Sequence, residues 1–198
     1  MKEYRNRQKL QVSFNSPVIL GFTGLCLVAL LMNYITKGYS NTHFFSVYRA
    51  SLLSPLTYLR LFFHVLGHAG MEHFLGNIML ILVVGPLLEE KYGSLNILFI
   101  ILATALVTGM VHMIFFPRTA LLGASGLAFA FIMLSSLTSI REGEIPLTFI
   151  LVALLYIGGL IFEGLFERNN IANLTHILGG LVGAWLGYIM HKGKMNRY

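Results

Sequence analysis

Aspartate is absent from this sequence, and all eight acidic residues are glutamates. Chemistry that needs an aspartate is therefore excluded, including a Ser-His-Asp triad, an aspartyl protease pair, an EF-hand calcium loop and an Asp-dependent phosphoryl-transfer site. Cysteine is nearly absent too. Because Cys26 is the single example, no disulfide can form within the chain.

Charged side chains are also scarce, since they make up 11% of the 198 residues, against 56% that are hydrophobic. The mean hydropathy is +0.74. A water-soluble domain of this size would expose too much apolar surface, whereas a bilayer accepts that surface and requires only that backbone polar groups pair internally. The net charge of +6 comes from sparse basic residues near the two ends, so we expect no nucleic-acid partner. The composition predicts an all-α protein of the lipid bilayer.

Long uncharged stretches predict six transmembrane helices, since about 20 residues cross about 30 Å of hydrocarbon. The stretches lie between Lys9 and Lys37 and at about 73–88, 95–116, 122–140, 146–162 and 171–190. The first lacks a small-residue cleavage site at its end, so we expect it to stay as an anchor. Lys and Arg divide nine to five between the two sides, which favours both termini in the cytoplasm and a place in the cell membrane.

One domain accounts for the whole chain. We expect a cytoplasmic N-terminal segment at 1–15, a six-helix core at 16–191 and a cytoplasmic tail at 192–198. The segment 38–72 mixes aromatic and aliphatic residues with arginine and histidine, which is typical of a structured loop in the membrane interface. No internal repeat supports an inverted-repeat transporter. The sequence does not indicate an oligomeric state.

Ser125 stands at the start of the fourth stretch, within Gly123-Ala124-Ser125-Gly126. Small neighbours would leave its hydroxyl approachable, although small residues at a helix start also serve simple close packing. Taken alone, the motif does not separate a nucleophile from a packing site.

His176 lies within the sixth stretch, and an ionisable residue at membrane depth indicates function unless it bonds a neighbouring helix. Gly179, Gly183 and Gly187 follow every four residues and form a smooth stripe near the face of His176. Small residues on the fourth stretch complement the stripe: Gly123, Ser125, Gly126, Ala128 and Ala130. Packing of the two helices would bring hydroxyl and imidazole together as a nucleophile and its base. The alternative is a glycine zipper without chemistry.

His73 and Asn77 are four residues apart at the start of the second stretch, so both side chains point from one helical face. They could donate hydrogen bonds to one oxygen and stabilise the negative charge that develops in acyl transfer, or they could join two helices. His64, His68 and His73 could instead hold a metal, but no HExxH motif is present and Glu72 is the only acidic residue nearby. We therefore expect neither a metal nor another cofactor.

Taken together, these motifs resemble the rhomboid family of intramembrane serine proteases over nearly the whole chain. His-x-x-x-Asn, Gly-x-Ser-Gly and His-x-x-Gly-x-x-x-Gly occur in the family's order after a first loop with arginine and histidines. The resemblance implies a six-transmembrane-helix rhomboid fold with Ser125 and His176 as a catalytic dyad that needs no third acid. It also implies an oxyanion hole made by His73, Asn77 and the Ser125 backbone amide.

The resemblance assigns supporting places to further residues. Arg60 resembles the first-loop arginine, His64 and His68 resemble the histidines before the second span, and Glu89 resembles a structural glutamate. The sequence departs from the family at three other positions. Leu59 stands where many members have tryptophan, Phe129 where a tyrosine often stacks on the catalytic histidine, and Thr175 where alanine is commoner.

The function implied is cleavage of transmembrane segments of other membrane proteins near the non-cytoplasmic face, after a small residue. Substrate entry would occur at the fifth span and the loop that holds Glu163, Glu167 and Arg168. Two alternatives belong to other classes: a catalytically silent rhomboid-like adaptor that binds transmembrane segments, and a small transporter or proton relay built on the histidines. The intact serine and histidine weigh against the first, and the lack of repeats weighs against the second.

Overall fold

The computed structural model describes residues 14–137, 147, 150–151, 154 and 170–195, and the structural statements below refer to these residues. The helices are α1 (Pro17–Ile35), α2 (Tyr39–His43), α3 (Pro55–Phe63), α4 (Met71–Tyr92), α5 (Ser94–Phe115), α6 (Ser125–Leu137) and α8 (Asn170–Met195), and a 3-10 turn, η1 (His64–Leu66), follows α3. This part of the chain contains no β-strand, only an isolated bridge. The predicted all-α fold class is confirmed.

Three helices, α1, α4 and α5, are long and apolar enough to cross a bilayer, and α6 and α8 contain shorter apolar stretches. They correspond to the first, second, third, fourth and sixth predicted spans. The fifth predicted span, with Glu163, Glu167 and Arg168, falls almost entirely outside the described residues. So do nearly all of the predicted N-terminal segment and much of the predicted tail.

The fourth helix begins later than the sequence suggested, at Ser125 and not near residue 122. The residues before it cannot be helical for two reasons. Leu121 pairs with Val47 in an antiparallel bridge, and Gly123 has a φ of +123°. The nucleophile candidate is therefore the first residue of α6, at the end of an extended entry segment (residues 121–124).

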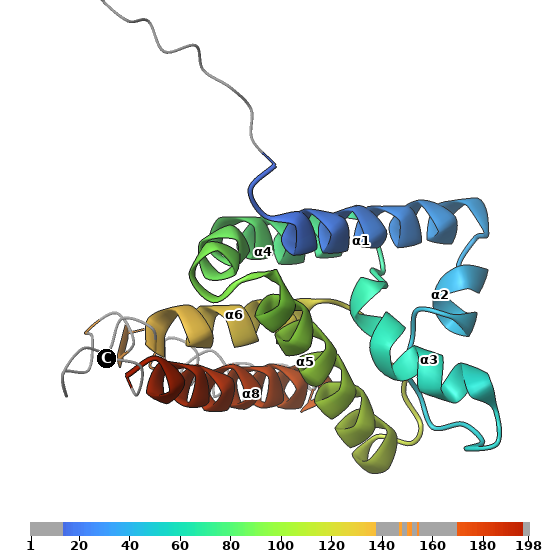
Figure 1. Ribbon diagram of the computed structural model, residues 1–198. Helices are drawn as coiled ribbons and strands as arrows, with labels where there is room; N and C mark the ends of the chain where they lie inside the picture. The colour runs from blue at the N-terminus through green and yellow to red at the C-terminus, as the bar shows by residue number, and fades with distance from the viewer. Residues whose placement is uncertain (1–13, 138–146, 148–149, 152–153, 155–169, 196–198) are drawn as a thin grey trace, which may run out of the picture.

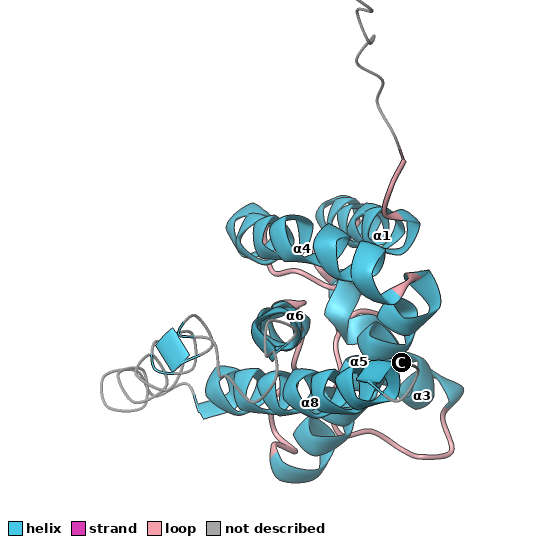
Figure 2. Cartoon of the chain, turned by 60° about the vertical axis from the view of Figure 1, so that its left-hand side comes forward, coloured by secondary structure: helices cyan, strands magenta, loops and turns pink. Residues whose placement is uncertain are grey.

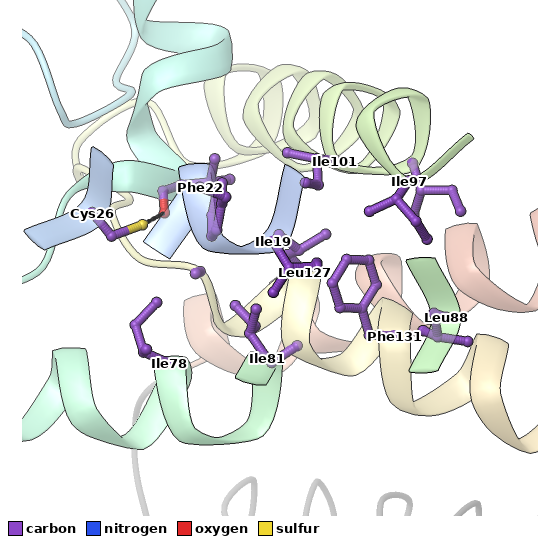
Figure 3. Packing of buried hydrophobic residues seen from close by; sticks show 14 of the residues in the cluster. Ile19, Phe22, Cys26, Ile78, Ile81, Leu88, Ile97, Ile101, Leu127 and Phe131 are labelled. Carbon is purple, nitrogen blue, oxygen red and sulfur yellow. Dashed lines mark hydrogen bonds between the residues drawn. The ribbon is translucent and has the colours of Figure 1, made fainter. Parts of the chain in front are cut away.

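Helix α6 lies in the centre of the molecule, between α4 and α8 in both views (Figures 1 and 2). Apolar side chains from several helices meet around it (Figure 3). They include Ile19 and Phe22 from α1, Ile78 and Ile81 from α4, Ile97 and Ile101 from α5, and Leu127 and Phe131 from α6. This core fixes the helix that carries Ser125 against three neighbouring helices.

A glutamate fixes the start of α1. Pro17 occupies the first turn, where its missing N–H costs nothing, and the free N–H groups of Val18 and Ile19 donate to the Glu89 carboxylate at 3.0 and 2.9 Å. The hydroxyl of Ser94, at the start of α5, donates to the same carboxylate at 2.7 Å. Glu89 thus holds the starts of α1 and α5 at the same end of the helical bundle.

Residues 36–70 form the first loop, which contains α2, α3 and η1 and lies alongside the C-terminal half of α1 (Figure 1). Its centre is Arg60, only 6% exposed, whose Nε donates to the His43 carbonyl at 2.8 Å and whose guanidinium lies 4.5 Å from the Tyr48 ring centre. Charge-assisted and cation–π contacts of this kind make a buried arginine tolerable. The loop is therefore an ordered part of the fold.

Candidate active site

Helices α6 and α8 pack backbone against backbone. A Cβ added at Gly179 would overlap the carbonyl oxygen of Gly126, and one added at Gly183 would overlap that of Ala130. The two helices lie side by side in Figure 1. Only glycine permits this approach, because any side chain would push the helices apart.

The same packing brings His176 to the helix that begins with Ser125. The His176 ring lies against Phe129, with ring centres 4.4 Å apart and an angle of 36° between the planes. Phe129 follows Ser125 by one helical turn, so the two share a face of α6, and the imidazole lies over that face. No hydrogen bond joins Ser125 to His176 here, and such bonds often tighten only when substrate binds.

His73 and Asn77 lie on the other side of the entry segment. A Cβ built at Gly123 would stand 2.7 Å from His73 Cε1, 2.8 Å from His73 Nε2 and 3.7 Å from Asn77 Nδ2. His73 also lies within electrostatic range of His176. The segment that leads into Ser125 therefore lies against the His-Asn pair of α4, and α8 contacts α6 at Gly126, the residue after Ser125.

The pair presents two donors towards this segment. Nδ1 of His73 accepts a long hydrogen bond, 3.4 Å, from the Ala69 amide, which leaves the ring proton on Nε2, the nitrogen facing Gly123. Asn77 is 7% exposed, and its Nδ2 is buried with no hydrogen-bond partner. A buried donor without a partner costs about 1–3 kcal/mol. Asn77 Nδ2 is one of nine such unpartnered polar atoms among the described side chains, and it faces the segment before Ser125.

Backbone hydrogen bonds to the first loop hold the entry segment in place. Leu121 and Val47 exchange two bonds, each 2.9 Å long, and the Gly123 amide donates to the His64 carbonyl at 2.9 Å. These bonds satisfy polar groups in the non-helical stretch just before Ser125. They also make the position of Ser125 depend on the first loop.

A family model described as the Rhomboid domain matches residues 55–193. The chain belongs to the rhomboid family.

Two curated relatives extend this comparison. The chain is 30% identical over 158 residues to Rhomboid-related protein 2 of Mus musculus, and the alignment covers 69% of this chain and 52% of that protein. It is also 30% identical over 132 residues to Rhomboid-related protein 1 of Caenorhabditis elegans, and this alignment covers 62% of this chain and 37% of that protein. This rhomboid chain thus spans about half or less of the length of these relatives.

The histidines of the rhomboid first loop are buried and bonded. His64 is 1% exposed, and its ring nitrogens lie 3.2 Å from the Arg60 carbonyl and 3.3 Å from the Thr108 hydroxyl. Burial, with a smaller contribution from His112 nearby, lowers the pKa of His64 to about 4, although the hydrogen bond to the Arg60 carbonyl acts in the opposite direction. Burial likewise lowers the pKa of His68 to about 4, with a smaller contribution from His73. Both rings are therefore neutral at pH 7.

These contacts leave little room for the alternative metal site. His68 lies edge-on to His73, with ring centres 5.2 Å apart, and bonds the Leu66 carbonyl through Nδ1. Within the described residues, no three His, Cys, Asp or Glu side chains gather closely enough to hold an ion. The histidines instead join the first loop to α4 and α5.

Three α5 residues support the site and were missed from the sequence. Thr108 bonds His64, and Gly109 lets the first loop approach, since a Cβ there would lie 3.1 Å from the Leu61 carbonyl oxygen and 3.2 Å from His64 Cε1. His112 is 1% exposed and bonds the Thr119 carbonyl at 3.1 Å. An ionisable residue within an apolar stretch was the available signal for His112.

The departures from the family pattern each have a place in the structure. Phe129 keeps its aromatic contact with the catalytic histidine candidate. The side chain and carbonyl of Thr175 lie 3.2 and 3.3 Å from a Cβ built at Gly126, so this residue forms part of the α6–α8 contact. Leu59 is 47% exposed, and its neighbour Arg60 is held through His43 and Tyr48.

Proposed function

We propose that this rhomboid protein is an intramembrane serine endopeptidase, with Ser125 as nucleophile and His176 as general base. The observation that carries the proposal is the buried, unpartnered Nδ2 of Asn77 beside His73 Nε2 and the segment entering Ser125. Two donors aimed at one place suit an oxygen that becomes negative during the reaction, which is the role of an oxyanion hole. Membership of the family and the contact between His176 and Phe129 support the same reading.

The reaction begins when the Ser125 oxygen attacks the carbonyl carbon of the scissile peptide bond and His176 takes the hydroxyl proton. The carbonyl oxygen becomes negative and accepts hydrogen bonds from His73, Asn77 and the Ser125 backbone amide. The C–N bond then breaks, His176 gives its proton to the departing amine, and an ester to Ser125 remains. Water attacks this ester, His176 takes the water's proton and returns it to Ser125, and the acid product leaves.

The proposed substrates are transmembrane segments of other membrane proteins. Close packing around Ser125 and Gly126 favours a small residue before the scissile bond. We place both termini in the cytoplasm, so that cleavage occurs near the opposite face of the membrane, and we place substrate entry at the fifth span. Efficient cleavage after leucine or phenylalanine would contradict the preference for a small residue.

The first experiment compares purified protein in liposomes with its Ser125→Ala and His176→Ala variants on a transmembrane reporter substrate. A matched control is Ser136→Ala, which removes from the same helix a hydroxyl that donates to the Ile132 carbonyl. Both dyad variants should lose cleavage while the control keeps it, with all four proteins folded. Full activity in either dyad variant would exclude this mechanism.

The rival function is that of an adaptor that binds transmembrane segments without cutting them. A serine-directed fluorophosphonate probe separates the two, because it reacts only with an activated hydroxyl. The protease predicts labelling of the parent that disappears in Ser125→Ala and falls sharply in His176→Ala. A folded parent that binds segments, resists the probe and cleaves none of several reporters would favour the adaptor.

A further inference from the structure

An apolar cavity of about 300 Å³ lies between α1, α5 and the first loop, away from the catalytic groups. We call it the α1–α5 cleft. Helix α1 forms one wall of the cleft, and α5 forms the second. The end of α3 and the 3-10 turn η1 together form its roof. The lining residues are Pro17, Val18, Gly21, Phe22, Leu25, Phe62, Phe63, Val65, Leu66, Leu98, Ile101 and Leu102. Two of them, Phe22 and Ile101, also belong to the buried core drawn in Figure 3, so the cleft borders that core.

The cleft lies in the half of the membrane nearer the start of α1. Glu89 fixes the starts of α1 and α5 at the same end, and the lining residues of both helices come from their first halves. The roof reaches the middle of the bilayer, because the Cys26 sulfur lies 3.9 Å from the Val65 carbonyl. Cys26 is about 14 Å along α1, which at about 1.5 Å per residue is half of its length.

The outer edge of the cleft faces the lipid. Leu25 is 56% exposed, Leu98 and Leu102 are each 42% exposed, and Phe63 is 39% exposed. Leu25, Leu98 and Leu102 belong to helices that are long and apolar enough to span the membrane. Water does not fill such a space, since an ordered water needs two to four polar partners and every lining side chain is apolar. An empty cleft would forfeit the dispersion contacts of its walls.

We propose that the α1–α5 cleft binds one acyl chain of a phospholipid from the leaflet on the side of Pro17. Its volume lies at the lower end of the range for small-molecule sites, about 300–1,000 Å³. A transmembrane helix, about 10–12 Å in diameter, is too wide to enter, which separates this site from any substrate groove. A single flexible hydrocarbon chain fits both the shape and the apolar lining.

The bound chain packs beneath the part of the first loop that holds the catalytic segment. Val65 and Leu66 form the roof, and they directly follow His64, whose carbonyl accepts the bond from the Gly123 amide. The acyl chain therefore supports the loop from its membrane side. This proposal does not depend on proteolysis, because binding can be measured in a catalytically inactive protein.

Gly21 and Gly24 provide a matched pair of variants. Both are exposed glycines of α1, and a Cβ added at either would meet nothing within 4 Å. Gly21 lines the cleft and Gly24 does not. Gly21→Leu fills the cleft with a side chain of this protein, whereas Gly24→Leu adds the same apolar group to the same helix outside it. Each replacement also raises helix propensity, so neither should impair folding.

The test places the full chain with Ser125→Ala in liposomes that contain a phosphatidylcholine with a diazirine near the middle of one acyl chain. After irradiation, the modified peptides are identified by mass spectrometry. We expect labelling concentrated on residues 17–25, 62–66 and 98–102, lost for the most part with Gly21→Leu and kept with Gly24→Leu. Labelling spread evenly over the lipid-facing surfaces, or equal in the two variants, would overturn the proposal.

Cleavage by the same two variants in the active background is measured separately. Loss of labelling in Gly21→Leu supports the lipid site whether or not the protein is a protease. Absence of cleavage in every variant would count against the proposed function alone, and evenly spread labelling would count against the lipid site alone.

Discussion

Replacing Gly123 with alanine should disable the site while leaving most of the fold intact. The backbone there has a φ of +123°, a conformation that costs a residue with a side chain about 1–3 kcal/mol. The new methyl would also lie 2.7 Å from Cε1 and 2.8 Å from Nε2 of His73, closer than real Cβ contacts allow. The imidazole must therefore move, and the entry segment with it.

The expected loss of activity follows from the displaced donor. Removing one oxyanion donor lowers kcat by about 10²–10³-fold, and His73 Nε2 is the proposed donor that the methyl displaces. We therefore expect Gly123→Ala to lower kcat by about 100-fold or more, with a smaller change in KM, because the donor acts mainly on the transition state. Single-turnover cleavage of a reporter in liposomes measures this effect.

Gly93→Ala is the control for backbone strain. Gly93 also has a positive φ, +86°, but a Cβ there would meet nothing within 4 Å, and the residue lies between α4 and α5. Both variants should lose stability in thermal unfolding through backbone strain, with a larger loss in Gly123→Ala because of its contact with His73, while only Gly123→Ala should lose activity per folded molecule. If folded Gly123→Ala cleaves as fast as Gly93→Ala, the assignment of His73 to the oxyanion hole is wrong.

Two further predictions concern stability. His64 and His68 have a pKa of about 4 in the folded protein, against an ordinary value of 6.5. As the pH drops from 6.5 towards 4, the unfolded chain therefore binds protons before the folded protein does. The free energy of unfolding should fall over this range by up to about 3 kcal/mol per histidine. Unfolding followed across that range measures the slope, which should shrink in His68→Gln. Glu89→Gln should lower the free energy of unfolding by about 1.5–3 kcal/mol or more, because hydrogen bonds to a carboxylate are lost at the start of α1. The next residue, Glu90, is exposed, so Glu90→Gln is the control. An equal loss of stability in Glu90→Gln would contradict the role of Glu89 in holding the start of α1.

Hydropathy and helical spacing were sufficient to predict much of this molecule. The bilayer sets the length of a span, so the apolar stretches predicted α1, α4 and α5 to within a few residues at most ends. The glycine spacing predicted that two distant helices pack together, and the backbone of α8 lies against that of α6 at Gly126 and Ala130. These features follow from local side-chain patterns that a sequence displays directly.

The extended entry segment before Ser125 could not be predicted in the same way. The sequence placed residues 122–124 in the fourth span, because they belong to a long uncharged stretch. What removes them from the helix is a pair of backbone bonds between Leu121 and Val47, more than 70 residues apart in the chain. Backbone donors and acceptors are the same for every residue, so such pairing leaves no mark in composition or periodicity. The contacts of Thr108 and Gly109 with the first loop were missed because they too depend on tertiary structure.

The first loop supplies hydrogen-bond partners that the segment before Ser125 requires. A serine at the start of a helix within the membrane needs a non-helical segment before it, and the polar backbone groups of that segment need partners that lipid does not offer. Leu121 and Gly123 find these partners in Val47 and His64. The His64 ring is itself held between the Arg60 backbone carbonyl and the Thr108 hydroxyl of α5. The Arg60 guanidinium lies over the ring of Tyr48, which directly follows Val47 in the chain. The loop histidine and arginine thus support the two loop residues whose backbone groups bond the segment before Ser125.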